Sequence, residues 1–499
     1  MISSKVGSPL SVYQRYFLLL LATTVLLQLV YSTLPNLLPQ EAYYWLYAKH
    51  LDWSYFDHPP MTAWSIALST YLGGDSVLFV RLPAVLFHAG GSLAAYLLAR
   101  ELLPSERLAF WVVLTMQLMV IFAIGGIIIT PDVPMICFWG FTLWAVLRAL
   151  KTEKWWWWHV SGVLLGLALL SKYSAGLIIG CVFLLLLLDR KQRRWLASPH
   201  PYLGLLWALA VFAPVVVWNA QHAWASFAFQ STHRLGMMES FRPRGLINLV
   251  GTQLLAVTPL LFLALLYALW CLTRRWWRDR GFDDLFILAF SVPVLLLFAS
   301  VSVRTQVKLN WPAPAYLTGA MALVLVWSEK MDNAPHRWRR WVAAACVSGA
   351  TLVSVVHALP VMPMPLGGAN SWSGWPQLAE RIESIKAEFP HEPFVFSDGH
   401  KTSSEIAYYT HPSSLVLAEN VYGDKARQFD YWTRPMSLTG RDALLVHSDT
   451  WPLSPERMET VRRQFQWVTE PETLSIIQKG HTVREFYIIR CFNYLGTGA

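Results

Sequence analysis

Long apolar runs recur from the N-terminus to about residue 360, separated by short polar stretches. Runs near 20 residues match the thickness of a bilayer and predict transmembrane helices. The pattern predicts about 11 membrane spans. They fall near 16–34, 78–99, 108–124, 134–149, 157–171, 174–188, 203–219, 248–272, 284–303, 311–328 and 340–358. A further apolar stretch at 60–72 predicts an interfacial or re-entrant helix.

The pattern changes after Met362, where polar and apolar residues mix and Ser, Pro and Gly punctuate the chain. Short apolar segments there predict strands at 393–398, 414–419, 442–448 and 484–490. Helical periodicity predicts helices at 376–389, 404–409 and 454–465. Alternating strands and helices indicate a small α/β domain. We therefore expect two domains, a transmembrane domain at 1–360 and a soluble α/β domain at 361–499.

Composition agrees with this division, since 55% of the 499 residues are hydrophobic and only 14% are charged. Soluble domains carry about 25% charged residues. The net charge of +9 does not indicate nucleic-acid binding, because Lys and Arg gather in every second loop between the predicted spans. This placement follows the positive-inside rule. It predicts a cytoplasmic N-terminus and a periplasmic C-terminal domain in a bacterial inner membrane. The five cysteines show neither metal-ligand nor disulfide spacing.

The stretch from Leu34 to Trp64 falls on the predicted outer face and is the strongest candidate for an active-site loop. It places Glu41, Asp57 and His58 among aromatic residues such as Tyr44. An acid held beside aromatics is partly desolvated, which favours a general base. The alternatives are an acid at a helix N-terminus for Glu41 and a solvated turn for Asp57 and His58.

Other charged residues interrupt apolar runs on the same predicted face. Asp132 lies between two prolines, and it is a candidate catalytic acid or a cap of the following span. Lys172, Arg81 and Lys308 are candidate partners of a lipid phosphate. Snorkelling of the side chain to the interface is the alternative for Lys172.

Aromatic segments near these charges are candidate contacts for a sugar or a lipid headgroup. The third outer loop contributes His222 and Arg234, and the neighbouring motifs contribute Tyr173 and Asn310. The alternative for the loop is anchoring of aromatic side chains at the interface.

Six motifs in order, EAYYWLYAKHLDWSYFDHPPMTAW, RLPAV, TPDVP, LSKYSAG, WNAQHAWASFAFQ and NWPAPAY, give the chain a family resemblance. Over about residues 10–330 the chain resembles the bacterial GT-C glycosyltransferases related to protein O-mannosyltransferases and to the aminoarabinose transferase acting on lipid A. The resemblance implies a polyprenyl-phosphate sugar donor and transfer on the outer face. Lys172 and Arg81 lie on motifs that resemble the phosphate-binding positions of the family.

The chain departs from this family where many members have Asp-Glu and it has Gln40-Glu41. The base would then be Glu41, or the role would fall to Asp57 or Asp132. A divalent metal near Asp57 or Asp132 stays open, because no ligand spacing requires one.

The expected function is an inverting glycosyltransferase that moves a sugar from a polyprenyl-phosphate donor to a glycolipid such as lipid A, a polysaccharide or a protein. A transporter or flippase of the polyprenyl-phosphate sugar is the alternative. No paired inverted halves are visible, and the acids lie at the outer surface rather than at mid-membrane. A sensor or scaffold is a third class, which would leave these acids unexplained.

Overall fold

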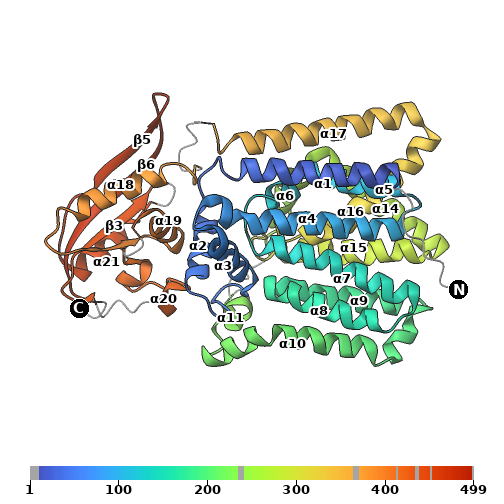
Figure 1. Ribbon diagram of the computed structural model, residues 1–499, viewed down its shortest axis with the longest axis horizontal. Helices are drawn as coiled ribbons and strands as arrows, with labels where there is room; N and C mark the ends of the chain where they lie inside the picture. The colour runs from blue at the N-terminus through green and yellow to red at the C-terminus, as the bar shows by residue number, and fades with distance from the viewer. Residues whose placement is uncertain are drawn as a thin grey trace. The chain divides into compact units, whose positions relative to one another are not determined.

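The computed structural model describes residues 10–233, 241–362, 370–411, 414–432, 438–449 and 452–496 (Figure 1). The chain forms two compact units. The helical unit comprises Met1–Tyr31, His58–Thr62 and Leu82–Val356. The mixed unit comprises Ser32–Asp57, Ala63–Arg81 and His357–Ala499. Two segments near the N-terminus, which flank the short segment His58–Thr62, thus fold with the C-terminal part of the chain. The domain boundary predicted at 361 stays a prediction.

The helical unit consists of helices that run alongside one another (Figure 1). Its longer elements are α1 (Val12–Tyr31), α4 (Val77–Leu102), α5 (Glu106–Gln117), α7 (Asp132–Thr152), α8 (Trp156–Ser171), α9 (Leu177–Leu188), α10 (His200–Gln221), α13 (Arg244–Val257), α14 (Pro259–Asp279), α15 (Phe282–Ser302), α16 (Ala313–Asn333) and α17 (Pro335–Ala358). Short elements connect them, namely α6 (Val120–Gly125), η1 (Tyr173–Gly176), η2 (Gln192–Ala197), α11 (Ala225–Ala228) and η3 (Phe229–His233). Only the segment of α4 after Arg81 belongs to this unit.

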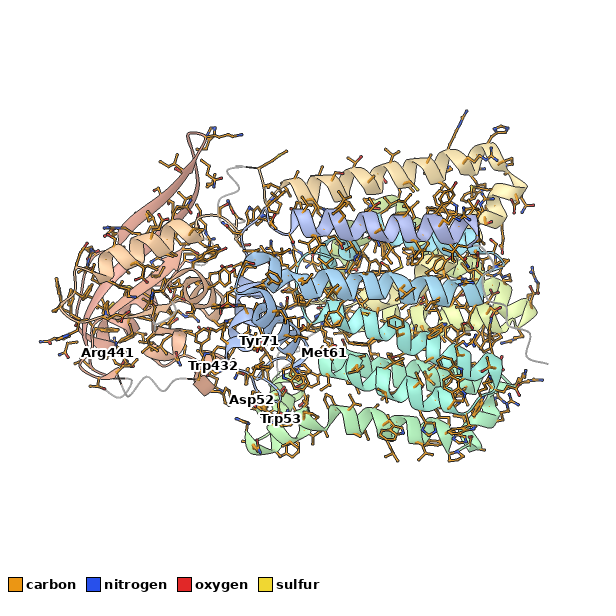
Figure 2. The ribbon with its side chains drawn as sticks, viewed as in Figure 1. Asp52, Trp53, Met61, Tyr71, Trp432 and Arg441 are labelled. Carbon is orange, nitrogen blue, oxygen red and sulfur yellow. The ribbon has the colours of Figure 1, made fainter. Side chains whose placement is uncertain are left out.

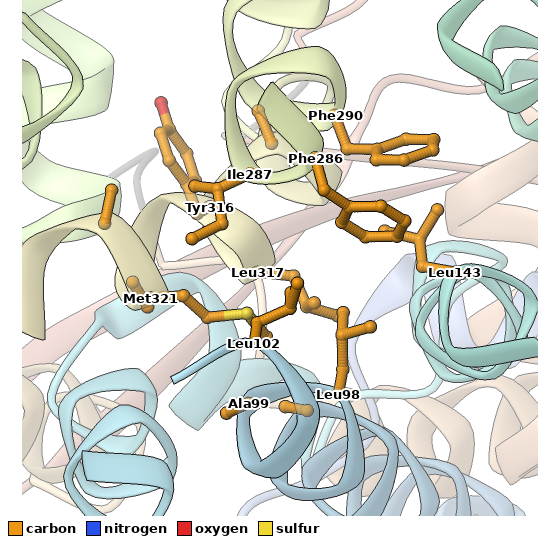
Figure 3. Packing of buried hydrophobic residues seen from close by; sticks show 14 of the residues in the cluster. Leu98, Ala99, Leu102, Leu143, Phe286, Ile287, Phe290, Tyr316, Leu317 and Met321 are labelled. Atoms are coloured by element: carbon orange, nitrogen blue, oxygen red, sulfur yellow. The ribbon is translucent and has the colours of Figure 1, made fainter. Parts of the chain in front are cut away.

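The core of the helical unit is a continuous apolar cluster. Figure 3 shows side chains from α4, α7, α15 and α16 meeting in it, with Phe286 and Phe290 facing Leu143 and Leu317. Phe286, Phe290 and Leu317 are fully buried. Burial of such side chains contributes about 1.5–3 kcal/mol each when water is the reference.

Seven helices among the described residues are long and apolar enough to cross a membrane. They are Val12–Tyr31, Val77–Leu102, Asp132–Thr152, His200–Gln221, Pro259–Asp279, Phe282–Ser302 and Pro335–Ala358. Three shorter apolar helices accompany them, Trp156–Ser171, Tyr173–Leu188 and Arg244–Val257. The protein is thus a multi-pass α-helical membrane protein, as the sequence predicted, while the count of about 11 spans stays a prediction.

Two predicted spans are wrong as single helices. The run at 248–272 divides into α13 and α14, because Thr258 has φ 72° and Pro259 follows it. Proline has no N–H to continue a helix and restricts the residue before it. The run at 108–124 divides into α5 and α6 at Leu118 and Met119, where Met119 is extended with φ −91° and ψ 123°.

Glycines bring α8 and α10 into backbone contact. A Cβ atom on Gly162 would lie 2.0 Å from the carbonyl oxygen of Gly204, and one on Gly204 would lie 2.5 Å from the carbonyl oxygen of Trp158. Small residues at such a crossing let two membrane helices approach closely.

Ion pairs join the helices at the end where α7 finishes and α8 begins. Arg148 pairs with Glu101 of α4, and Lys151 pairs with Asp283 of α15. Arg275 of α14 pairs with both Asp284 and Glu329. The cations Arg148, Lys151 and Arg275 define what we call the basic end of the bundle, which the charge pattern predicted to be cytoplasmic.

The mixed unit is built around a six-stranded sheet with the order β2-β1-β3-β6-β4, in which β5 also pairs with β6. The strands are β1 (Phe394–Ser397), β2 (Val416–Leu417), β3 (Ala443–Ser448), β4 (Phe465–Val468), β5 (Glu472–Gln478) and β6 (His481–Tyr494). β1 is parallel to β2 and β3, and β6 is antiparallel to β3, β4 and β5. Helices α18 (Trp375–Lys386), α19 (His400–Tyr409), α20 (Phe429–Trp432) and α21 (Pro455–Gln464) complete it, with η5 (Glu419–Tyr422).

The central strands β1 and β3 are covered on both faces. Phe394 and Phe396 of β1 belong to one apolar cluster, whereas Val395 between them belongs to another. Side chains of a strand alternate between the two faces, so each cluster covers one face. All four predicted strands and all three predicted helices of this region are present, while β4 and β5 were not predicted.

The mixed unit also contains α2 (Pro39–Lys49) and most of α3 (Met61–Gly73). α3 confirms the helix predicted at 60–72. It exposes apolar side chains, with Tyr71 86% and Leu72 74% exposed. Tyr71 is labelled in Figure 2. Trp53, in the connection before it, is 58% exposed (Figure 2). Exposed aromatic and aliphatic side chains on a short helix fit the predicted place at a membrane interface.

Candidate active site

Three polar side chains meet at one end of the helical unit. The carboxylate of Asp132 accepts a hydrogen bond from Nζ of Lys172 at 2.7 Å and another from Nδ2 of Asn310 at 2.6 Å. The side chains of Asp132 and Lys172 are only 11% and 13% exposed. The structure thus brings together three residues that the sequence singled out separately, one of them 178 positions from Asp132.

Helix ends position this cluster. Asp132 is the first residue of α7, and Lys172 is the residue after α8, with extended backbone at φ −158° and ψ 137°. Asn310 lies three positions before α16. A carboxylate at a helix N-terminus is favoured by the helix dipole, and a cation is favoured at a C-terminus. The predicted helix-start role of Asp132 and its place in a polar cluster therefore coexist.

Polar and aromatic side chains of η1, α10 and α11 contact one another in the same unit. The hydroxyl of Tyr173 is 2.5 Å from the hydroxyl of Ser226. Asn219 Oδ1 accepts from the backbone N–H of Ser226 at 3.1 Å, which shapes the turn after α10. His222 stacks on Trp218 with ring centroids 4.1 Å apart, and its Nδ1 donates to the carbonyl of Trp218.

Glu41 and Arg81 form a buried ion pair within the mixed unit. Their side chains are 0% and 1% exposed. Nε of Arg81 donates to Oε1 of Glu41 at 2.9 Å, and Nη2 donates to Oε2 at 2.6 Å. The backbone N–H of Leu38 also donates to Glu41 at 3.0 Å, which ties the pair to the start of α2.

Arg81 has no N–H left over for a phosphate in this arrangement. Besides Glu41, it donates to the carbonyls of Ser32, Pro35 and Asn36 at 3.0, 2.8 and 2.7 Å. A guanidinium has five N–H donors, and these contacts use all of them. The geometry therefore assigns Glu41 and Arg81 to fixing the loop before α2.

Asp57 is the other buried acid of the predicted loop, with its side chain 5% exposed. Its Oδ1 accepts a hydrogen bond from the hydroxyl of Tyr47, and its Oδ2 accepts one from Nη1 of Arg427 at 3.3 Å. Burial, with the Asp57 charge as the next cause, raises the pKa of Tyr47 well above its usual value, so its hydroxyl remains a donor. Tyr44 accepts a hydrogen bond from Gln40 at 2.8 Å. His58 follows Asp57 but belongs to the helical unit.

Sequence reasoning missed the ionisable groups that the C-terminal part supplies to the mixed unit. Arg427 contacts Asp57, and Glu405 on α19 is fully buried with no hydrogen-bond partner for either oxygen among the described residues. Burial raises the pKa of Glu405 well above its usual value. Burial also lowers the pKa of Lys401. For Lys401 and Glu405, the sequence signal was their place as charged residues in a helix of mixed polarity.

Asp398 directly follows β1, and its burial leads us to expect that the stability of the folded protein depends on pH. Burial raises its pKa to about 7. An unfolded chain releases this proton near pH 4, so between these pH values the folded protein binds more protons and loses stability as pH rises. We expect Asp398→Asn to flatten this dependence, by up to ~4 kcal/mol between pH 4 and pH 8. Unfolding free energies measured across that range test it. Glu470→Gln, at an exposed position, is the control, and parallel profiles for wild type and Asp398→Asn would contradict the assignment.

The remaining predicted site residues are less constrained. Lys308 is exposed, two positions before Asn310. Arg234 lies outside the described residues. No group of three or more His, Cys, Asp or Glu side chains suited to a metal occurs in the part of the chain that the structure describes. The carboxylates of Asp57 and Asp132 each have a cation beside them.

Comparisons with known proteins agree with this architecture. Residues 57–218 match the family model described as dolichyl-phosphate-mannose-protein mannosyltransferase. The lipid A galacturonosyltransferase RgtD of Rhizobium johnstonii is 26% identical over 285 residues, which are 57% of this chain. The matched part spans 59% of that relative's length.

Solved structures extend the similarity to nearly the whole chain. ArnT of Cupriavidus metallidurans in the apo state superposes with a TM-score of 0.66 at 14% identity, over 96% of this chain and 98% of that one. Its structure bound to undecaprenyl phosphate gives a TM-score of 0.64 at 14% identity, over 95% and 98%. The Archaeoglobus fulgidus oligosaccharyltransferase gives 0.53 at 12% identity, over 86% and 69%. The chain is therefore a multi-pass membrane protein with the GT-C fold, similar in structure to ArnT and similar over residues 57–218 to the dolichyl-phosphate-mannose-protein mannosyltransferase family.

Proposed function

We propose that the protein is an inverting glycosyltransferase that moves a sugar from a polyprenyl-phosphate donor to a hydroxyl of a glycolipid such as lipid A, or of another glycan or protein. The observation that carries the proposal is the shielded Lys172–Asp132–Asn310 cluster at the meeting of three helix ends. The similarity to ArnT, one structure of which holds undecaprenyl phosphate, supports this donor class. The similarity to a lipid A galacturonosyltransferase supports a lipid A acceptor.

The reaction needs one displacement at C1 of the sugar. A carboxylate takes the proton of the acceptor hydroxyl, whose oxygen forms a bond to C1. The bond between C1 and the phosphate oxygen breaks, and the polyprenyl phosphate leaves with the electron pair. A single displacement inverts the anomeric centre. Charge grows on the departing phosphate, where Lys172 would stabilise it. The N-terminus of α7 adds a favourable dipole for an anion.

Among the three candidate acids, Asp57 suits the base role best. A carboxylate offers about four lone-pair positions. The carboxylate oxygens of Glu41 accept hydrogen bonds from Arg81 and from the backbone N–H of Leu38, and the side chain is fully buried. Asp57 belongs to the predicted active-site loop, and its partners include the neutral hydroxyl of Tyr47 and the guanidinium of Arg427. Asp132 is the second candidate, with Lys172 and Asn310 as its partners.

The helical bundle has a proposed orientation in the membrane. The basic end of the bundle carries Arg148, Lys151 and Arg275, which the positive-inside rule assigns to the cytoplasm. Asp132 begins α7 and Lys151 lies in its last turn, so the cluster would face the periplasm. A C-terminal α/β domain on that face of the inner membrane would meet acceptors there.

Transfer of a radiolabelled sugar by the purified protein tests the function directly. The assay supplies a synthetic polyprenyl-phosphate sugar and a lipid A acceptor, and it reads labelled acceptor and released polyprenyl phosphate. Formation of both products in equal amounts supports a transferase. Movement of the labelled donor across a vesicle membrane without any transfer to an acceptor would instead establish a flippase.

Lys172→Met removes the cation of the cluster and keeps a long apolar side chain. We expect kcat/KM for the donor to fall by about 10²–10³-fold, because one charged donor to the leaving phosphate is lost. Lys154→Met is the matched control, since Lys154 is exposed at the basic end of the bundle. Equal kcat/KM in the two variants would remove Lys172 from phosphate stabilisation.

A further inference from the structure

A buried glutamine lies within the helical unit, outside the residues assigned to the reaction. Gln253 of α13 is 3% exposed. It shares the buried face of this helix with Leu249 and Val257, which lie one turn before and one turn after it. Burial of an amide costs free energy unless the amide is hydrogen-bonded. A polar side chain on the inner face of a membrane bundle therefore indicates a specific role.

The amide of Gln253 is hydrogen-bonded through both its oxygen and its nitrogen. Its Oε1 accepts a hydrogen bond from the hydroxyl of Tyr316 at 2.7 Å. Its Nε2 donates to the backbone carbonyl of Leu309 at 3.2 Å and to Oγ1 of Thr252 at 3.3 Å. An amide nitrogen carries two hydrogens, so these contacts use both of them. Because Tyr316 lies on α16, the network links α13, α16 and the turn that precedes α16.

Backbone hydrogen bonds hold this turn on either side of Leu309. The carbonyl of Lys308 accepts one from the N–H of Trp311 at 3.1 Å, and that of Asn310 accepts one from the N–H of Ala313 at 3.2 Å. Each bond spans three positions, as in a β-turn. A bond of the same kind to the carbonyl of Leu309 would need the N–H of residue 312.

Residue 312 is a proline, which has no N–H to donate. Gln253 supplies the hydrogen bond that the carbonyl of Leu309 cannot receive from Pro312. This carbonyl and the N–H of Asn310 belong to one planar peptide group. Gln253 therefore fixes the peptide plane from which Asn310 continues.

Asn310 transmits this positioning to the polar cluster. Its Nδ2 donates to Oδ2 of Asp132 at 2.6 Å, and Nζ of Lys172 donates to the other carboxylate oxygen, Oδ1, at 2.7 Å. The carboxylate is thus oriented by one donor on each oxygen. A displaced Asn310 would leave this carboxylate free to rotate, and the ammonium group of Lys172 would lose its fixed place.

Hydrogen bonds between membrane helices also stabilise bundles without any further role. Ser291 is such a case, since its fully buried hydroxyl lies 2.6 Å from that of Thr318 and donates to the carbonyl of Ala315 at 3.1 Å. These contacts join α15 to α16 alone. The bond from Gln253 reaches the turn that carries a member of the cluster, which favours a positioning role.

We propose that Gln253 is a positioning residue for the site of the leaving phosphate. It acts through the peptide that joins Leu309 to Asn310, and Asn310 then orients Asp132. The hydroxyl of Tyr316 holds the glutamine amide in the orientation that donates to this peptide. The inference rests on the function proposed above, because it assigns Gln253 a role in sugar transfer.

Sugar transfer by full-length Gln253→Met tests the proposal. Methionine keeps an unbranched side chain and removes the amide. We expect kcat to fall by about 10–10²-fold, because a small displacement of positioned groups is enough to slow the chemical step. The KM for the donor should change less, since Lys172 contributes most when charge grows on the departing phosphate. Ser291→Ala is the matched control, because it removes another buried hydrogen bond to α16, and it should transfer sugar at the wild-type rate.

Asn310→Ala shows whether Gln253 acts through this residue. We expect Asn310→Ala alone to lower transfer, and the double variant with Gln253→Met to stay within about twofold of it. A general structural defect would instead multiply with the loss in Asn310→Ala, because the effects of independent sites add as free energies.

Hydrogen exchange gives a measurement that needs no sugar transfer. The backbone N–H groups of Trp311 and Ala313 should exchange about fivefold faster in Gln253→Met than in wild type, the equivalent of one lost hydrogen bond. Ser291→Ala should exchange them at the wild-type rate. Mass spectrometry of peptides that cover 306–315 records these rates.

Full transfer by Gln253→Met would overturn the inference, and so would losses that multiply in the double variant. Unchanged exchange in Gln253→Met would also overturn it, since the glutamine would then not hold the turn. If the wild type transfers no sugar, the proposed function fails, and the exchange rates alone decide whether Gln253 holds this turn. If Gln253→Met does not fold, Tyr316→Phe takes its place with the same expected results, since it removes only the hydroxyl that holds the amide.

Discussion

Sugar transfer by Asp57→Asn is expected to fall by about 10²–10⁴-fold, the contribution of a general base. Asparagine keeps the size of the side chain and an oxygen that accepts the Tyr47 hydroxyl. It cannot take a proton from the acceptor. Because the loss concerns the chemical step, kcat should fall more than the KM for the donor changes. The radiolabel transfer assay with saturating donor measures it.

Asp52→Asn is the control for this variant, because Asp52 lies in the same loop and bonds the neighbouring backbone N–H of Trp53. It should transfer sugar at the wild-type rate. Full activity of Asp57→Asn together with loss in Asp132→Asn would move the base to Asp132. Loss in Glu41→Gln alone, with an unchanged unfolding temperature, would restore Glu41 to that role.

Arg81→Met is expected to destabilise the mixed unit by about 3–5 kcal/mol. The substitution leaves the carboxylate of Glu41 buried without its cation, and it also leaves the carbonyls of Ser32, Pro35 and Asn36 without their donor. Thermal unfolding of the purified protein and protease sensitivity of the 32–57 segment measure the effect.

The double variant Arg81→Met with Glu41→Gln should be less destabilised than the sum of the two single variants, because it leaves no unpaired charge. Lys49→Met is the surface control, since Lys49 and Asp75 are 39% and 45% exposed and such pairs contribute about 0–1 kcal/mol. An Arg81→Met protein as stable as Lys49→Met would show that the buried pair does not hold this loop.

The site could be predicted only in part. Its residues stand out in short sequence motifs, but the contacts between them join residues far apart in the chain. The sequence singled out Asp132, Lys172 and Asn310 as charged or polar breaks in apolar runs. That they meet depends on the packing of α7, α8 and α16, which no local pattern encodes. Arg81 shows the reverse case, since its cationic motif suggested a phosphate site, whereas Glu41 and three backbone carbonyls occupy all five of its N–H groups.

The fold could be predicted more completely than the site, because it follows the pattern of apolar residues along the chain. Periodicity located most of the helices and four strands of the C-terminal part, β1, β2, β3 and β6. It missed the break at Thr258, because a long apolar run hides the effect of a single proline. It missed β5 (Glu472–Gln478), which is irregular between Ile476 and Ile477 and whose place depends on pairing with β6. It also gave no sign that 32–57 folds with the C-terminal part, since that association is made of long-range contacts such as Gln428 to Phe56 at 2.7 Å.

The short α8–α9 hairpin has a consequence for the biogenesis of this protein. α8 has 16 residues and α9 has 12, so each is shorter than the roughly 20 residues that cross a bilayer alone. The turn between them carries Lys172, whose charge is paired with Asp132 of α7 in the folded bundle. We therefore expect the translocon to retain this hairpin until α10, which contacts α8 through Gly204, has been synthesised, so that α8, α9 and α10 insert together rather than one helix at a time.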